Sequence, residues 1–434
     1  MKLNALYLIQ HLLDDSSGNQ DISALIFHHL HFGKLARDKR RMKNLERRFL
    51  YQSLSEDERR LRRNCMNREG LPDPKMSPFE KVYASKSDQN MITLTGLDYA
   101  SFKKLLKEFA PLYNGTTPHT KDFSVVKKQS KCGKPRKLNA AACLGLALAW
   151  TRTRGSTFPL QCLFGITAPT VSIYVRYSRR LLDIILSRDP DAAISFPSHE
   201  EIEKFKDDIS ARYPHIKDAV FSMDGLKLKI EKSPDPFEEN AHYNGWHHTH
   251  WVVNVLVFAP DGKIVCCGYN YPGCTHDSKV AHMSGIYEKL MRCHNETGAK
   301  TVVDSAFRVS GDYKVLFYRS GRISFSSNDN LGPIINREAT SYRQASEWSM
   351  QSLQGSMPRM KDTLKWENNG ERKLILKVFF LLHNYRVANV GVNQTNTVFQ
   401  RNIGRNAEVL VGLEGRSRAS YISKAVKEMK KMEK

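Results

Sequence analysis

Two apolar runs joined by an Asp-Gly pair constrain the fold of this chain more than any other feature. Residues 248–260 (HTHWVVNVLVFAP) and 263–272 (KIVCCGYNYP) flank Asp261-Gly262, a dipeptide typical of a tight β-hairpin turn. Just before them, residues 218–230 end in apolar residues that alternate with lysines, a pattern that predicts a further strand. Periodicity then predicts a helix at about 276–294, a strand at 301–304, and helices at about 337–353 and 373–390. This order of elements indicates a mixed α/β core.

Three acidic residues lie on these elements in the order strand, later strand, helix: Asp224, Asp304 and Glu347. A lone carboxylate is costly to bury in an apolar strand, so each aspartate either makes structural hydrogen bonds at a strand end or shares cations with the others. Two aspartates and a glutamate offer the oxygen ligands that Mg²⁺ prefers. Two such ions about 4 Å apart activate a water or a 3′-hydroxyl and stabilise the leaving oxygen at phosphorus. We therefore expect these residues to be catalytic and to bind two Mg²⁺ or Mn²⁺ ions.

Asp277 is the alternative second metal ligand, and with the neighbouring His276 it is an auxiliary candidate for the site. Asp277 opens a predicted helix, where N-capping explains an aspartate without any metal. The pattern therefore favours Asp304 over Asp277.

A strong basic excess indicates a polyanionic partner. The chain has 67 Lys and Arg against 45 Asp and Glu, a formal net charge of +22, which favours nucleic acid or an anionic membrane. No apolar stretch has the length needed to span a bilayer, so we expect no membrane partner. The eight cysteines show neither a CxxC pair nor zinc-finger spacing, as expected for reduced thiols inside a cell.

Composition divides the chain into four predicted regions: a basic helical arm at 1–90, a helical DNA-binding region at 91–214, the mixed α/β region at 215–392 and a basic tail at 393–434. In the arm, the run containing Arg40 and Arg41 is either a direct DNA contact or a nuclear-import signal. A second basic stretch is too rich in charge, Gly and Pro to pack, and we expect it to be a mobile loop lying along phosphates. Its cations are Lys127, Lys128, Lys131, Lys134, Arg136 and Lys137.

Residues 160–186 have the layout of a helix-turn-helix. Leu160–Phe164 predicts a first helix, Gly165 a turn, and Thr167 the cap of a second helix. Val171, Val175 and Leu182 would face the core of this unit, and Arg176, Arg179 and Arg180 would be exposed to DNA. Many helical hairpins share this pattern, so a pair of helices that only packs is the alternative.

The histidine-rich run at 241–250 (AHYNGWHHTH) suggests a zinc site. His248 and His250 would share one strand face, yet no cysteine stands at a usual zinc-ligand spacing. Loop histidines at a DNA-facing rim, or one histidine that helps a general base, are the favoured interpretation.

Five motifs, taken in order, resemble those of PIF/Harbinger transposases. They are Met223-Asp224-Gly225, residues 271–278 (YPGCTHDS), Asp304-Ser305-Ala306-Phe307, residues 345–355 (ASEWSMQSLQG) and residues 382–385 (LHNY). The resemblance covers roughly 95–390 and includes the helix-turn-helix. It implies an RNase H-like catalytic domain at 215–392, a mixed sheet flanked by helices, with Asp224, Asp304 and Glu347 as a DDE triad. The chain departs from the family at the second acidic motif, which usually reads Gly-Asp-x-Gly-Tyr and here lacks both glycines.

The resemblance further implies a nuclear DNA transposase, a Harbinger-like nuclease that cuts double-stranded DNA at terminal inverted repeats. The released 3′-hydroxyl ends would be joined to an A/T-rich target. A Myb-like helper protein and a homodimer or larger assembly are expected partners. Two alternatives stay open: a domesticated, non-cutting DNA-binding descendant, and a stand-alone RNase H-like nuclease acting on RNA or hybrids. The latter would use the same metals but leaves the helix-turn-helix unexplained.

Overall fold

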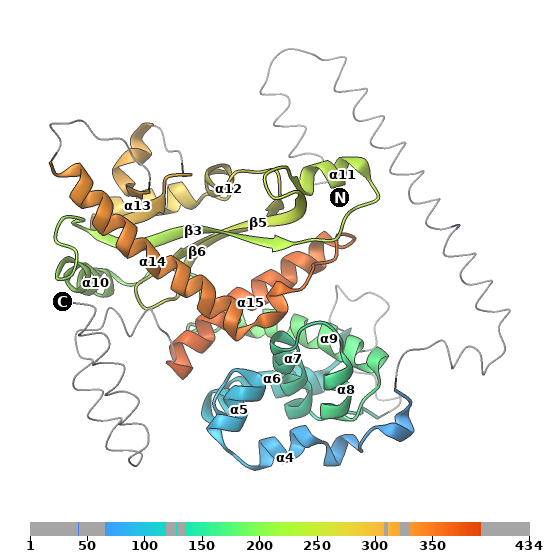
Figure 1. The fold of residues 1–434 in the computed structure, drawn as a ribbon. Helices are drawn as coiled ribbons and strands as arrows, with labels where there is room; N and C mark the ends of the chain where they lie inside the picture. The colour runs from blue at the N-terminus through green and yellow to red at the C-terminus, as the bar shows by residue number, and fades with distance from the viewer. Residues whose placement is uncertain are drawn as a thin grey trace, which may run out of the picture.

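A computed structural model describes residue 42 and residues 66–118, 127–128, 135–307, 311–321 and 330–391. Figure 1 shows a helical region, residues 66–186, lying against a larger region built on one sheet. Most of the predicted N-terminal arm and the whole predicted tail lie outside the described residues.

The helical region contains six α-helices and two short 3₁₀ turns among the described residues: η1 (Arg68–Gly70), η2 (Pro74–Met76), α4 (Pro78–Ala84), α5 (Asp88–Thr95), α6 (Tyr99–Gly115), α7 (Ala140–Arg152), α8 (Phe158–Phe164) and α9 (Ala168–Leu186). Nearly all of α7 is buried, which its alanine- and leucine-rich sequence predicts. The side chain of Asn139 caps α7 by accepting a hydrogen bond from the amide of Ala142 at 2.7 Å. A two-stranded ladder of β1 (Thr116–Thr117) and β2 (Lys127–Lys128) follows α6.

The turn between α8 and α9 has the geometry that its glycine predicts. Gly165 adopts a left-handed conformation with φ 64° and ends α8. A Cβ added there would lie 2.3 Å from the carbonyl oxygen of Pro72, so only glycine fits. In the described part of the chain, no single helix is apolar and long enough to cross a bilayer; α8 and α9 pass that test only as a pair, and they are bent by 86°.

The sheet has six strands: β3 (Ala219–Lys229), β4 (Tyr243–Asn244), β5 (Thr249–Phe258), β6 (Ile264–Pro272), β7 (Lys300–Asp304) and β8 (Phe317–Ser320). Strand β5 lies between β6 and β3 and is antiparallel to both, with the predicted Asp261-Gly262 turn joining it to β6. Strand β7 is parallel to both β3 and β8. The short β4 pairs with the start of β5.

Helices cover both faces of this sheet (Figure 1). One face carries α12 (Asp277–Met283) and α13 (Ile286–Thr297), which bury Met223, Val255 and Val303. Helix α10 (His199–Ser210) contributes to the hydrophobic clusters of both faces. The other face carries α14 (Gly332–Ser356) and α15 (Asn369–Val390). The structure is therefore a mixed α/β fold with a curled sheet flanked by helices, as expected for an RNase H-like core, and the predicted fold class is confirmed.

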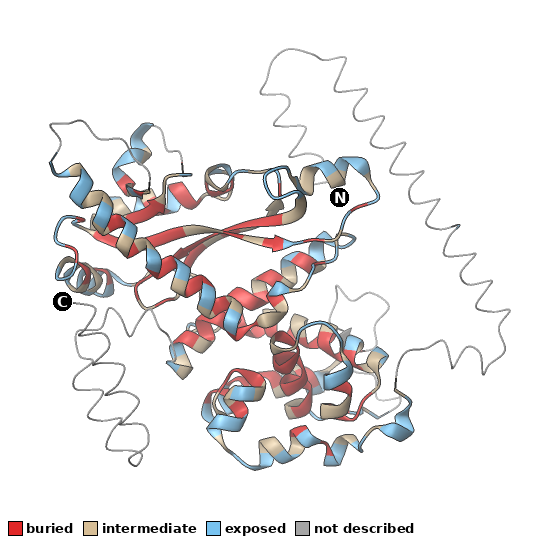
Figure 2. Ribbon diagram, viewed as in Figure 1, coloured by how far each residue is buried: buried red, intermediate tan, exposed pale blue. Residues whose placement is uncertain are grey.

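Helix α15 joins the sheet to the helical region. Asn384 accepts from the amide of Ile264 on β6 at 2.8 Å and donates to the carbonyl of Ala193 at 2.8 Å. The neighbouring Tyr385 donates to the carbonyl of Ser101 on α6 at 2.9 Å. Figure 2 shows α15 and the strands beside it as largely buried. The LHNY motif thus holds the two regions together through buried polar contacts.

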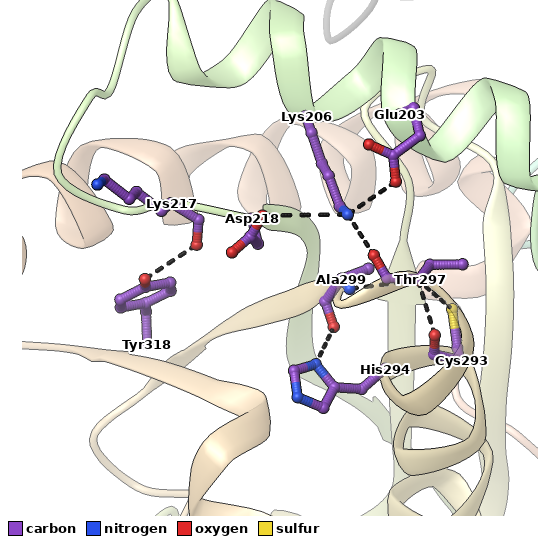
Figure 3. A network of polar contacts seen from close by, with 9 residues as sticks. All are labelled: Glu203, Lys206, Lys217, Asp218, Cys293, His294, Thr297, Ala299 and Tyr318. Carbon is purple, nitrogen blue, oxygen red and sulfur yellow. Dashed lines mark hydrogen bonds and ion pairs between the residues drawn. The ribbon is translucent and has the colours of Figure 1, made fainter.

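A polar network fixes the ends of the two central parallel strands (Figure 3). Lys206 of α10 contacts Glu203 at 2.8 Å and the carbonyl of Thr297, and it lies 4.0 Å from Asp218. The amide of Lys300 donates to the carbonyl of Asp218 at 2.7 Å. This network sets the register of β7 against β3.

Candidate active site

The register of the parallel strands brings two of the predicted carboxylates together. Met223 of β3 pairs with Val303 of β7, so the next residues along both strands are Asp224 and Asp304. Side chains alternate along a strand, and Asp304 therefore shares a face with Val302, which packs against α14. Asp224 projects to the same face, where Arg343 of α14 contacts it.

Asp224 is a largely buried carboxylate. Its Oδ1 accepts a hydrogen bond from the amide of Gly225 at 2.7 Å. The pKa of Asp224 is raised to about 6: burial is the largest cause, the nearby Asp304 and Asp277 add to it, and the amide of Gly225 and the charge of Arg343 oppose it. The carboxylate is thus mostly ionised at neutral pH, and its ionised form is destabilised by burial.

The second acidic motif closes a tight turn although it lacks the two expected glycines. Asp304 is the last residue of β7, and its Oδ1 accepts from the amide of Ser305 at 2.6 Å. The amide of Phe307 bonds back to the carbonyl of Asp304 at 3.1 Å, and the Phe307 ring is fully buried. Gly321, which follows β8, lies beside this turn: it has φ 111°, and a Cβ there would lie 3.5 Å from Oδ1 of Asp304.

Glu347 comes from α14, the helix that crosses the same face of the sheet. Its side chain is 46% exposed, and its Oε1 accepts from Nη2 of Arg343 at 2.7 Å. The other terminal nitrogen of Arg343, Nη1, lies 3.5 Å from Oδ2 of Asp224. One guanidinium therefore bridges two of the three predicted ligands. Across the part of the chain that the structure describes, no group of three His, Cys, Asp or Glu side chains is close enough to hold a metal ion.

Asp277 lies on the opposite face of the sheet from Asp224. Its carboxylate packs on the backbone of Gly225, where an added Cβ would be 2.4 Å from Oδ2. Burial raises the pKa of Asp277, while Lys227 and His276 act against the increase. The capping explanation for Asp277 is wrong, because His276 is the N-cap of α12 and Asp277 is its first helical residue. The buried Oδ1 of Asp277 has no hydrogen-bond partner among the described residues.

The histidine-rich run begins in the last residues of α11 (Pro236–His242) and continues through the β4–β5 hairpin. Nδ1 of His242 lies 3.0 Å from the carbonyl of Trp251, and Nε2 of His250 lies 3.7 Å from Oε1 of Glu239. Trp246 at the hairpin tip is 89% exposed. These contacts do not gather three metal ligands, so they give no support to a zinc site.

The prediction that Arg179 and Arg180 are exposed is wrong. Their side chains are only 11% and 12% exposed, and both pair with Glu371 of α15. Arg179 also lies over the ring of Trp150 at 4.9 Å. Arg176, the third predicted DNA contact on α9, is half-buried. The periodicity of α9 marked these arginines as its outer face, but α15, nearly two hundred residues later in the chain, covers that face.

Arg136 is likewise a structural residue instead of a loop cation. Its guanidinium stacks over the ring of Tyr113 at 4.2 Å and donates to the carbonyls of Tyr113 and Thr116. Lys137 is exposed. Lys127 and Lys128 form β2, so part of the expected loop is a strand. Lys131, Lys134, Arg40 and Arg41 lie outside the described residues.

Sequence reasoning missed Arg343, the residue that contacts two of the predicted ligands. Its position four residues before Glu347 was a usable signal, because residues at i and i+4 are neighbours on a helix surface.

Comparison with known proteins identifies the sheet region. Residues 223–384 match the model of a family described as DDE superfamily endonuclease. The matched segment begins at the residue before Asp224, includes Asp304 and Glu347, and ends at Asn384 of α15. No curated protein and no solved structure matches this chain. The sheet region is therefore DDE transposase-like, of an endonuclease type.

Proposed function

We propose that this protein is a PIF/Harbinger-type DNA transposase that cuts at terminal inverted repeats and joins the 3′-hydroxyl ends to an A/T-rich target. The observation that carries the proposal is the placement of Asp224 and Asp304 at equivalent positions on adjacent parallel strands, facing the helix that bears Glu347. The match of residues 223–384 to DDE endonucleases supports the same class of chemistry. The five motifs given above favour the narrower family.

The donor set fits a hard divalent cation such as Mg²⁺ or Mn²⁺, which DDE endonucleases generally use. Asp224, Asp304 and Glu347 offer carboxylate oxygens only, the ligand type that Mg²⁺ prefers. When bound, such ions activate the attacking water or 3′-hydroxyl and stabilise the leaving oxygen. Asp224 and Asp304 would hold them from the sheet, and Glu347 would complete the set from α14. With a pKa of about 6, Asp224 is ready as an anionic ligand at neutral pH.

The DNA would be held by sites beyond this centre. We propose that the basic segments at 34–68 and 401–434 and the lysines of 127–137, among them the exposed Lys137, neutralise phosphates. The exposed Trp246 and the histidines beside it offer an aromatic rim. A nuclear location, a Myb-like helper protein and a homodimer or larger assembly that holds two DNA ends belong to the same proposal.

A non-cutting, DNA-binding descendant is the second candidate. The bridge from Arg343 to Asp224 and Glu347 favours it, since a guanidinium already contacts two of the three carboxylates. The intact set of acidic residues favours cutting.

The test is Mn²⁺ binding by calorimetry to the full chain, as wild type and as Asp224→Asn, Asp304→Asn and Glu347→Gln, each with and without duplex DNA. We expect every substitution to weaken binding while circular dichroism shows an intact fold. Nicking of supercoiled plasmid, compared with RNA and hybrid substrates, then separates the transposase from an RNA-directed nuclease. Mn²⁺ binding that is indifferent to all three substitutions, with DNA present, would refute the metal site, and metal binding without nicking would favour the non-cutting descendant.

Salt dependence tests the phosphate contacts separately. We expect DNA affinity to fall by orders of magnitude between about 50 and 200 mM salt, because each neutralised phosphate releases condensed counterions. Affinity that stays constant over this range would contradict the proposed role of the basic segments.

A further inference from the structure

The guanidinium of Arg343 occupies a position that has no function in the reaction as proposed above. It lies 2.7 Å from Oε1 of Glu347 and 3.5 Å from Oδ2 of Asp224. These two carboxylates come from different elements, α14 and β3, so the arginine is a cation placed between two acidic groups that would otherwise share metal ions. Arg343 is itself only 24% exposed.

The helix packing holds Arg343 at this place. The preceding residue, Tyr342, is fully buried, and its hydroxyl donates to the carbonyl of Val220 on β3 at 2.5 Å. Ala345 and Ser346 are buried on the same side of α14. Arg343 and Glu347 are four residues apart and lie along the border of this buried face, where a helix places such side chains one above the other. The backbone of α14 is thus anchored, while the long arginine side chain can rotate without breaking that anchor.

Electrostatics explains why a cation is retained there. Asp224 is buried near Asp304, and the charge of Arg343 favours its ionised form. A divalent ion would satisfy the same oxygens, but it cannot share the space between Asp224 and Glu347 with a guanidinium, and two positive charges at that distance repel.

We infer that Arg343 is a resident counter-ion that competes with the metal for Asp224 and Glu347, and that duplex DNA relieves the competition by offering a phosphate to the guanidinium. Arginine pairs with phosphate in the same bidentate manner as with carboxylate, so the exchange replaces one charge-assisted contact with another. The metal site would then form fully only when DNA is present, which restricts cutting to the DNA-bound state. This inference rests on the proposed function.

The experiment is Mn²⁺ calorimetry on the full chain at about pH 8, where protons compete little for a carboxylate whose pKa is about 6. Arg343→Gln removes the charge and keeps much of the side-chain length. Arg337→Gln is the matched control, because Arg337 is an exposed arginine on the same helix. We expect Arg343→Gln to bind Mn²⁺ about tenfold more tightly than wild type without DNA, the change that loss of one partly buried ion pair allows. Arg337→Gln should match wild type.

The second arm adds a short duplex of arbitrary sequence. DNA should tighten Mn²⁺ binding in wild type and in Arg337→Gln, and should have much less effect in Arg343→Gln. Arg343→Lys, which keeps the charge without the planar fork, should resemble wild type without DNA.

The outcomes are separable from those of the proposed function. Unchanged or weaker Mn²⁺ binding in Arg343→Gln, in a protein where Asp224→Asn still abolishes binding, overturns the competition and leaves the metal site intact. Equal tightening by DNA in wild type and Arg343→Gln overturns the exchange with phosphate. If Asp224→Asn has no effect on Mn²⁺ binding even with DNA present, the metal site itself is refuted, and this inference with it.

Discussion

Replacing Asp224 with asparagine should stabilise the fold at neutral pH. The side chain is 24% exposed, and burial is the largest cause that raises its pKa, from 3.8 to about 6. A difference of this size corresponds to about 3 kcal/mol between the protonated and ionised forms. Above the folded-state pKa the carboxylate is ionised in both the folded and the unfolded chain, and only the folded chain bears the desolvation cost. Asparagine has nearly the same shape and carries no charge.

The sign of the pH dependence follows from linkage. A carboxylate with a raised folded-state pKa binds its proton more tightly in the folded chain, so its stabilising contribution is complete below pH 3.8 and is lost as the pH rises through about 6. The difference in unfolding free energy between Asp224→Asn and wild type should therefore be near zero at about pH 4 and approach roughly 3 kcal/mol at about pH 7.

The assay is urea unfolding of the full chain, followed by tryptophan fluorescence across this pH range without divalent ions. Asp312→Asn, an exposed aspartate in η3 (Gly311–Leu316), controls for the loss of one negative charge. A variant that is less stable than wild type at neutral pH would refute the reasoning. It would show that the attraction between Asp224 and Arg343 outweighs the cost of burial.

Two further predictions concern packing, one beside the candidate site and one between α9 and α15. Gly225→Ala should destabilise the fold by about 1–3 kcal/mol, because the new Cβ would lie 2.4 Å from the carboxylate of Asp277. Adding Asp277→Ala should recover most of that loss in thermal unfolding, and additive losses in the double variant would contradict the contact. Glu371→Gln should cost about 2–4 kcal/mol in urea unfolding, since it removes the charge of the buried carboxylate that pairs with both Arg179 and Arg180. A loss no larger than that of an exposed ion pair would show that these arginines find other partners.

Local signals in the sequence were sufficient for the elements that carry the acidic residues. Alternating leucines and lysines predicted β3, and Asp261-Gly262 predicted the hairpin of β5 and β6. The short apolar run that ends in Asp304 predicted β7, because β-branched apolar residues followed by a charged residue are typical of a buried strand and its end. These patterns depend only on neighbouring residues, so they can be recognised without knowledge of the tertiary structure.

Helix boundaries were harder to predict. The single helix expected at 276–294 is two helices, α12 and α13, which meet at Ser284-Gly285. Gly285 has φ 70°, a conformation that ends a regular helix. Helix α6 continues through Pro111 to Gly115, although proline is unfavourable inside a helix. The break at Gly285 agrees with local propensity, whereas the helical conformation at Pro111 goes against it.

Nothing in the sequence indicated that three arginines assigned to DNA binding form ion pairs or hydrogen bonds within the protein. Arg136, Arg179 and Arg180 lie in stretches whose charge suggests phosphate contacts, yet each is bound to groups of the protein itself. Their partners are supplied by segments distant in the sequence, such as Glu371, and a net positive charge does not distinguish such cations from exposed ones. The overall basic charge therefore overstates the surface available to DNA on the described residues.

The same argument changes how the candidate site should be understood. Three carboxylates on one face of a sheet repel one another and are costly to bury, so a fold that holds them without metal needs either protons or a cation. Asp224 shows the first response, in its raised pKa, and Arg343 shows the second. Glu347 remains on the more exposed edge of α14, where its charge costs less. The fold thus keeps these acidic residues apart, balanced by burial as a protonatable group and by one guanidinium, and gathering them into one cluster would need additional positive charge.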